Sequence, residues 1–191
     1  VAAFTRVSYC KLRNTGATLA AVGTAGGSSL YNCDIQGGSG AASAVAAISH
    51  TAIIGCYIHD TATGITMSTG FNMTVIGCII DTCATCGIDF TSSQDCGSQV
   101  HGNTFYGAET PAGIGIRVIA AGYRVTITNN IFYGLTTALS CVSQTQAHYI
   151  DYNNFYNNTA DATNIKKGPN DTAVNPSFTD AAGGNFAIGS A

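Results

Sequence analysis

The sequence predicts an all-β solenoid, in which short strands coil and stack with a repeat of about 23 residues. The prediction depends on a repeated phrase, on a second phrase that follows it after a turn, and on a composition with little charge. The first phrase is clearest in FNMTVIGCII, residues 71–80, where Val75 and Ile80 flank Cys78. A repeat of this length with one strand-like phrase per period is the signature of a solenoid.

The first phrase is an apolar residue, two residues, Cys or Asn, one residue, and an apolar residue. Its central residues are Cys10, Cys33, Cys56, Cys78, Asn103, Asn130 and Asn153, at steps of 22 to 27 residues. They should stack about 4.8 Å apart as a structural ladder inside the coil. We expect inward, unbridged thiols, because parallel Cβ directions suit a disulfide poorly and buried Cys behaves as a small apolar residue. The asparagine amides should hydrogen-bond along the column.

A second phrase of four residues follows each turn and should form another strand. We place it at residues 18–21, 44–47, 64–67, 87–90, 115–118, 138–141 and 164–167. Strand alternation points its second and fourth residues inward and its third residue outward. The outward column is then Thr66, Asp89, Arg117, Ser140 and Lys166. The two phrases together predict a solenoid of about seven coils.

The composition excludes some classes of function. Charged residues make up only 9% of the 191 residues, and the formal net charge is −3. A nucleic-acid partner would need a surface of Lys and Arg, so the charge argues against one. No run of about 18 apolar residues is present, so the sequence predicts no transmembrane helix. The 23 glycines and the many small polar residues suit tight turns between stacked strands.

The phrases VIGCII, VHGNTF, ITNNIF and IDYNNF resemble the repeats of right-handed parallel β-helix proteins of the pectate-lyase-like superfamily. The resemblance covers roughly residues 4–167. It implies the fold and is unspecific for activity. It predicts a right-handed parallel β-helix over residues 1–167. Because the chain starts at Val1 directly before the first phrase, we expect it to be a piece of a longer protein, or to have that end covered by another domain.

The tail resembles the terminating segment of many repeat proteins of bacteria and bacteriophages. In that segment a pattern like Asp-Pro-x-Phe leads to Gly-Asp/Asn-Phe, and here Asn175 replaces the usual Asp. We therefore expect an irregular capping segment over residues 168–191. Phe178, Phe186 and Ile188 should cover the open end of the core, because Pro169 and Pro176 cannot continue a strand ladder.

Asp89 and Arg117 are the candidate catalytic residues, because they would sit one coil apart as a base and a charge stabiliser. The resemblance implies clustered carboxylates for β-helix enzymes that cut polysaccharides, with Arg or Lys and calcium added in lyases. A hydrolase needs two carboxylates at a set separation. The alternative interpretation is that the two residues form a surface ion pair that contributes little to stability. Asp60 and Asp81 follow the first phrase in adjacent coils and could approach each other. Because they are offset by one register position, they are interpreted as turn residues that bond local backbone amides.

Cys83 and Cys86 form a CxxC, with Cys96 and His101 downstream. Zinc would take four such ligands, but the segment is a single predicted loop without a second CxxC. Three states stay open for Cys83, Cys86 and Cys96: reduced thiols, a loop disulfide, or metal ligands. The four histidines share no repeat position, so no His-based triad is indicated. We expect no metal and no cofactor.

Tyr106, Tyr133 and Tyr156 each follow an inward Phe by one residue, so they should point outward in one column. Such a column could stack on sugar rings or on a partner protein. The alternative is stacking between coils that only stabilises the ladder. We choose this column as the candidate binding face.

These observations favour a non-enzymatic structural or adhesive module that displays a rigid binding face. The missing acid cluster, the low charge and the phage-like tail point to a bacteriophage virion decoration protein or tail spike. Rods of this type commonly form trimers in the families that this chain resembles. The expected partners are further copies of the chain, other virion proteins or a surface polysaccharide, on a virion or outside the cell. The alternative is a secreted carbohydrate-active enzyme, a polysaccharide lyase or glycoside hydrolase.

Overall fold

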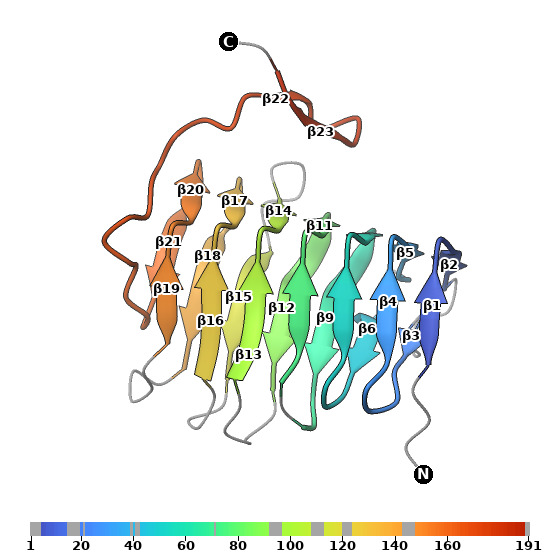
Figure 1. Ribbon diagram of the computed structural model, residues 1–191. Coiled ribbons are helices and arrows are strands. Elements are labelled where there is room, and N and C mark those ends of the chain that lie inside the picture. Colours follow the sequence, from blue (N-terminus) through green and yellow to red (C-terminus); the bar gives the residue numbers. More distant parts are fainter. Residues whose placement is uncertain are drawn as a thin grey trace.

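The computed structural model describes residues 5–14, 20, 22–38, 40, 43–70, 72–91, 97–107, 113–119, 124–142 and 148–189. Phe71, the first residue of FNMTVIGCII, lies outside the described residues. The described residues form three parallel sheets of seven strands each and one two-stranded antiparallel sheet (Figure 1). Each coil contributes one strand to each of the three sheets, so the predicted all-β solenoid is confirmed.

Each of the three parallel sheets takes one strand from every coil. Sheet A contains β1 (Arg6–Ser8), β4 (Ser29–Tyr31), β7 (Ala52–Ile54), β10 (Thr74–Ile76), β13 (Gly97–His101), β16 (Arg124–Thr128) and β19 (Tyr149–Asp151). Sheet B contains β2 (Lys11–Arg13), β5 (Asp34–Gln36), β8 (Tyr57–His59), β11 (Ile79–Asp81), β14 (Thr104–Tyr106), β17 (Ile131–Tyr133) and β20 (Asn154–Tyr156). Sheet C contains β3 (Val22–Gly23), β6 (Ser43–Ala47), β9 (Thr61–Met67), β12 (Cys83–Phe90), β15 (Ile114–Val118), β18 (Thr137–Cys141) and β21 (Ala160–Thr163). The C-terminal hairpin consists of β22 (Phe178–Asp180) and β23 (Asn185–Ile188).

The core is a set of in-register columns of like apolar side chains. In sheet A, Val75 pairs with Ile53 on one side and Val100 on the other. In sheet B, the column that passes through Ile80 continues as Phe105, Phe132 and Phe155. These three rings stack with centroid separations of 4.8 and 5.1 Å. The inward positions of the first phrase are therefore confirmed.

The second phrase is confirmed in the interior coils and wrong at both ends. Val22, not Leu19, pairs with Val45 in the first coil, and Leu19 itself lies outside the described residues. In the last coil Ala162 pairs with Leu139, so Thr163 and not Lys166 follows Ser140 in the outward column. Near each end of the solenoid, more than one stretch of residues has the alternation of a strand. The neighbouring strand decides the register, because a slip by one residue would turn every side chain over.

A sharp corner joins sheet A to sheet B in every coil. Its seven residues all have φ between 48° and 65°: Tyr9, Asn32, Gly55, Gly77, Gly102, Asn129 and Tyr152. Gly and Asn tolerate this left-handed conformation, which explains the Gly or Asn before most ladder residues. Each Cys or Asn of the ladder directly follows such a residue, so the whole ladder lies along one inner corner of the solenoid.

The tail differs from the expected cap. Residues 168–174, not the hairpin, lie against the last coil, where Thr172 pairs with Asn154 and its carbonyl accepts from the Phe155 amide. The hairpin lies over the outer side of sheet B instead (Figure 1), where its Phe178 and Phe186 contact tyrosines. Ile188 is 70% exposed and covers nothing of the core. No helix in the described part of the chain is long and apolar enough to cross a membrane.

Candidate functional site on sheet B

The ladder residues are bonded to one another along the inner corner. Cys33, Cys56 and Cys78 are buried, and their thiols are free. The Cys56 amide donates to the Cys78 sulfur at 3.4 Å. A side-chain hydrogen bond with Cys78 lowers the pKa of Cys56 to about 7, while the same bond and burial raise that of Cys78. Cys10, at the first coil, is only half-buried and is also free.

The asparagines of the ladder form one continuous chain of acceptors. Asn103 Oδ1 accepts from the Cys78 amide at 2.8 Å, and Asn130 Oδ1 accepts from the Asn103 amide at 2.9 Å. Asn153 Oδ1 then accepts from the Asn130 amide at 3.0 Å. Each side-chain nitrogen donates to a neighbouring backbone carbonyl and to the side-chain oxygen of the next residue in the column, which for Asn153 is the Asp171 carboxylate. Such complete pairing is what a buried polar column requires.

Asp89 and Arg117 pair in register across β12 and β15, on the face where the sequence places them. Arg117 Nε donates to Asp89 Oδ1 at 3.0 Å and Nη2 donates to Asp89 Oδ2 at 2.5 Å. Asp89 is only 6% exposed. Because both carboxylate oxygens are engaged, the contacts of this pair are those of a structural ion pair, and the bond to Asp89 raises the pKa of Arg117.

Cys83 and Cys86 lie within strand β12, so the expected loop is wrong there. The strand shifts its register against β9 between these two residues. Both thiols are free and buried. Burial raises the pKa of Cys83 and raises that of Cys86 to about 12, which makes them poor nucleophiles. Cys96 lies outside the described residues, and within the described ones no three His, Cys, Asp or Glu are grouped to hold a metal ion.

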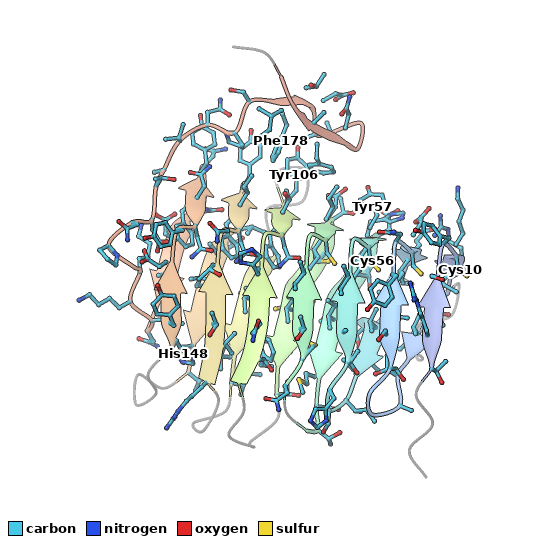
Figure 2. All side chains as sticks on the ribbon, in the orientation of Figure 1. Cys10, Cys56, Tyr57, Tyr106, His148 and Phe178 are labelled. Carbon is cyan, nitrogen blue, oxygen red and sulfur yellow. The ribbon has the colours of Figure 1, made fainter. Side chains whose placement is uncertain are left out.

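Tyr106, Tyr133 and Tyr156 stand in register on the outer side of sheet B. Their neighbouring ring centroids are 5.4 Å apart in both steps. Figure 2 shows Phe178 of the hairpin above Tyr106. Phe186 meets Tyr106 edge-on at 5.4 Å, and Phe178 lies 6.0 Å from Tyr133. The tyrosine column therefore exists as one surface, and the chain's own hairpin lies on part of it.

The other half of the same face carries a polar network, which we call the His59 cluster. Its members are Arg13, Asp34, Tyr57, His59, Asp60, Asp81 and Thr82. Arg13 holds Asp34 with two bonds, from Nη1 to Oδ1 at 2.9 Å and from Nη2 to Oδ2 at 2.8 Å. These bonds, with a further one from His59, lower the pKa of Asp34 to about 2.

His59 connects two carboxylates of this cluster. Its Nε2 lies 2.9 Å from Asp34 Oδ1, and its Nδ1 lies 2.8 Å from Asp60 Oδ2. The imidazole also stacks on the Tyr57 ring at 4.3 Å, with only 13° between the ring planes. The ring is thus held on three sides, and its orientation is set by the network.

Asp81 has a different environment from Asp34. It is 6% exposed, and the Tyr57 hydroxyl donates to its Oδ2 at 2.9 Å. Its Oδ1 is buried and has no hydrogen-bond partner among the described residues. Burial raises the pKa of Asp81, while the bond from Tyr57 and the nearby Thr82 backbone amide oppose the shift. Two carboxyl groups with opposite pKa shifts, raised for Asp81 and lowered for Asp34, therefore lie in one cluster.

Two residues of the cluster have left-handed backbone conformations, as corner residues of other coils also do. Asp60 has φ 50° and Thr82 has φ 46°, a conformation that β-branched residues rarely adopt. The two residues hold each other: the Asp60 amide donates to Thr82 Oγ1 at 3.1 Å, and this hydroxyl donates to Asp60 Oδ1 at 3.2 Å. The bonded carboxylates and imidazole, together with the opposite pKa shifts of Asp34 and Asp81, make this cluster the candidate site.

Comparison with known proteins identifies the family. A family model described as a right handed beta helix region matches residues 2–135. The chain belongs to the right-handed β-helix family. No curated protein and no solved structure matched it. The three-sheet solenoid continues past the matched region to β21, so the right-handed β-helix is longer than the match.

The interpretation of Asp60 as a backbone-bonding turn residue was wrong in this β-helix. Its carboxylate bonds the side chains of Gln36, His59 and Thr82 instead. The signal for the cluster was present in the repeat, because Arg13, Gln36 and His59 occupy the register position that becomes the tyrosine column. Asp81 pairs with Tyr106 on one side, and on the other side its strand β11 pairs with β8, the strand of His59. Asp81 therefore joins the polar and aromatic halves of the column. The β-helix thus presents one outward column that is polar at one end and aromatic at the other.

Proposed function

We propose that this β-helix is a non-enzymatic structural and adhesive module, of the type carried on bacteriophage virions as a decoration or spike protein. The observation that carries the proposal is the outward column of sheet B. It contains Arg13, Gln36, His59, Asp81, Tyr106, Tyr133 and Tyr156.

A surface polysaccharide is the ligand that this column suits. Aromatic faces take the apolar faces of sugar rings, while carboxylates, an imidazole and a guanidinium bond hydroxyl groups. Neighbouring coils repeat about every 4.8 Å along the column, so contacts recur at regular steps as the units of an extended chain do. The hydrogen bonds between parallel strands hold these side chains at set distances. Binding should therefore cost little conformational entropy.

Binding to immobilised bacterial O-antigen and capsular polysaccharides tests this proposal. Arg13→Gln and Tyr156→Ala remove contacts at the two ends of the column. Each should weaken binding by about tenfold, because Arg and Tyr side chains are the types that contribute most to binding energy. Thr66→Ala, on the outer side of sheet C, is the matched control and should bind as the wild type does. Equal loss in all three variants, or binding by none of the proteins, would contradict the proposal.

The native mass of the material that contains the chain tests the virion part of the proposal. Co-purification in a fixed ratio with capsid or tail proteins is expected, with several copies of the chain in each assembly. A chain that runs alone as a monomer would count against a virion role.

A second candidate function is that of a carbohydrate-active enzyme, and Asp81 is the observation that favours it. Two carboxyl groups whose surroundings shift their pKa values in opposite directions, as for Asp81 and Asp34, are the arrangement used for acid–base cleavage of glycosidic bonds. The geometry favours Asp81 over Asp89 for this role, since both Asp89 oxygens are bonded to Arg117. An enzyme would release reducing ends or unsaturated sugars from the same polysaccharides. Asp81→Asn should lose this activity while it keeps its fold.

A further inference from the structure

We propose that the C-terminal hairpin is a displaceable cover over a sugar-binding platform made by Asp81, Tyr106 and Tyr133. The inference rests on the proposed function, because it concerns the same column, and it adds how access to that column is controlled. In the state that the structure shows, the cover is closed.

The hairpin is built as a unit of its own. Among the described residues its strands pair only with each other, Phe178 with Ile188 and Asp180 with Asn185. Its turn is closed by bonds within the hairpin, from the Gly184 amide to the Ala181 carbonyl at 3.0 Å and from the Gly183 amide to Asp180 Oδ1 at 3.0 Å. A segment that keeps its own hydrogen bonds can move away from the solenoid without breaking them.

The hairpin meets the solenoid through aromatic rings. Phe186 packs edge-on against Tyr106 and Phe178 packs against Tyr133. At the tip, a Cβ on Gly184 would lie 3.7 Å from the Tyr57 hydroxyl, so the turn reaches the His59 cluster. Figure 2 shows the hairpin extending over Tyr106 toward Tyr57. The hairpin thus spans the junction between the aromatic and polar halves of the column.

The connection to the solenoid provides a hinge. Val174 is attached to the last coil, because its amide donates to Asn154 Oδ1 at 2.8 Å and its carbonyl accepts from Asn154 Nδ2. The hairpin begins only at Phe178. Residues 175–177 therefore lie between an anchored point and the cover, and Ser177 has φ 51°, as in a sharp bend.

The surface under the cover has an unmet hydrogen-bonding need. Tyr106 and Asp81 are each 6% exposed, and they are register partners in adjacent coils. Asp81 Oδ1 is buried without a partner among the described residues. A buried acceptor without a donor is unfavourable, and a sugar hydroxyl would satisfy it. Sugar rings on Tyr106 and Tyr133 would replace the ring contacts that Phe186 and Phe178 give up. A ligand that meets both needs shifts the hairpin toward its open position.

The experiment compares the wild type with the double variant Phe178→Ala/Phe186→Ala. Ile188→Ala is the matched control, because it removes an exposed apolar side chain from the same hairpin. Binding is measured on the array of O-antigen and capsular polysaccharides. Tyrosine exposure is measured by nitration with tetranitromethane and mass spectrometry, with Tyr152, which is exposed, as the internal standard.

The double variant should bind polysaccharide about tenfold more tightly than the wild type, and its Tyr106 should be nitrated faster. Bound polysaccharide should protect Tyr106, and Ile188→Ala should behave as the wild type in both assays. If the double variant exposes Tyr106 but binds as the wild type does, the cover is overturned while a binding face elsewhere on the column stands. If wild-type Tyr106 is nitrated as fast as Tyr152, the cover is likewise overturned. If neither the wild type nor any variant binds a polysaccharide, both the proposed function and the proposed cover are wrong.

Discussion

Asp171 accepts a hydrogen bond from the backbone nitrogen of Asn153 at 2.7 Å, so an aspartate ends the column of asparagines that begins at Asn103. The same Oδ1 also accepts from Asn153 Nδ2 at 3.2 Å. The last position of the column only has to accept hydrogen bonds, because no further coil follows Asn153 in the part of the chain that the structure describes. A carboxylate meets that need, and its second oxygen accepts from the Gly168 amide at 2.8 Å, which holds the tail against the end coil.

Loss of this terminal acceptor should destabilise the solenoid. Asp171→Ala leaves the buried Asn153 amide without a partner, so the free energy of unfolding should fall by about 1–3 kcal/mol. Asp171→Asn is the control, since its amide oxygen can still accept, and it should stay close to the wild type. Urea unfolding of the three proteins measures the difference. Equal stability of the Ala and Asn variants would show that the bond to Asn153 has no energetic role.

The close approach of neighbouring coils in sheet C leaves no room for a side chain at Gly115. A Cβ there would lie 2.6 Å from the Ala138 carbonyl oxygen and 2.9 Å from Phe132 Cδ1. Gly115→Ala should therefore lower stability by about 1–3 kcal/mol, as overpacking does. Gly97→Ala is the matched change in a strand, with its nearest contact at 3.6 Å, and should shift stability by less than about 0.5 kcal/mol. Thermal unfolding of both variants checks this, and a neutral Gly115→Ala would mean that the coils can move apart.

The pairing of Arg13 with Asp34 should appear as a stability change in acid. The pKa of Asp34 is lowered from 3.8 to about 2 by the bonds to Arg13, so the stabilisation is complete above about pH 4 and is lost as the pH falls through about 2. Arg13→Gln should bring this pKa back toward its ordinary value and reduce the loss of stability between these limits. At neutral pH the effect should stay below about 1 kcal/mol, because the Arg13 side chain reaches solvent and water screens the pair. Carboxyl titration by NMR measures the pKa directly, and an unchanged value in Arg13→Gln would contradict the assignment.

Asp81 should show the opposite dependence. Its pKa is raised by burial, so the folded state is penalised as the pH rises above the ordinary value of 3.8 and is unaffected below it. Asp81→Asn should therefore be more stable than the wild type at neutral pH, with a gain that vanishes in acid. Urea unfolding at neutral pH and at about pH 3 tests this. A gain that persists in acid would point to packing rather than to the buried charge.

The interior of the solenoid could be predicted from the sequence because its causes are local. Val75, Cys78 and Ile80 alternate with outward residues, and repetition places like residues in one column. The ends could not be predicted in this way. At Val22 and at Ala162 more than one local alternation is available, and only the hydrogen bonds to the adjacent coil choose between them.

The candidate site was predicted in part. The tyrosine column was found from its position after the inward Phe, and the pairing of Asp89 with Arg117 was anticipated from the second phrase. The His59 cluster was missed because its members have no common residue type: Arg13, His59 and Asp81 share a position, not a chemistry. Their bonds depend on side-chain lengths across neighbouring coils, which no single repeat shows.

The sequence by itself determined that this chain coils into a parallel β-solenoid and which side chains its core contains, because alternation and period are properties of the chain alone. Only the tertiary structure decided what stands on the outer face. Tyr57 must lie beside His59 before their rings stack. Phe186 meets Tyr106 only because the tail turns back along sheet B, from the last coil past β17 to β14. Contacts of that kind depend on the length of each coil and on the path of the tail. A local sequence pattern predicts neither.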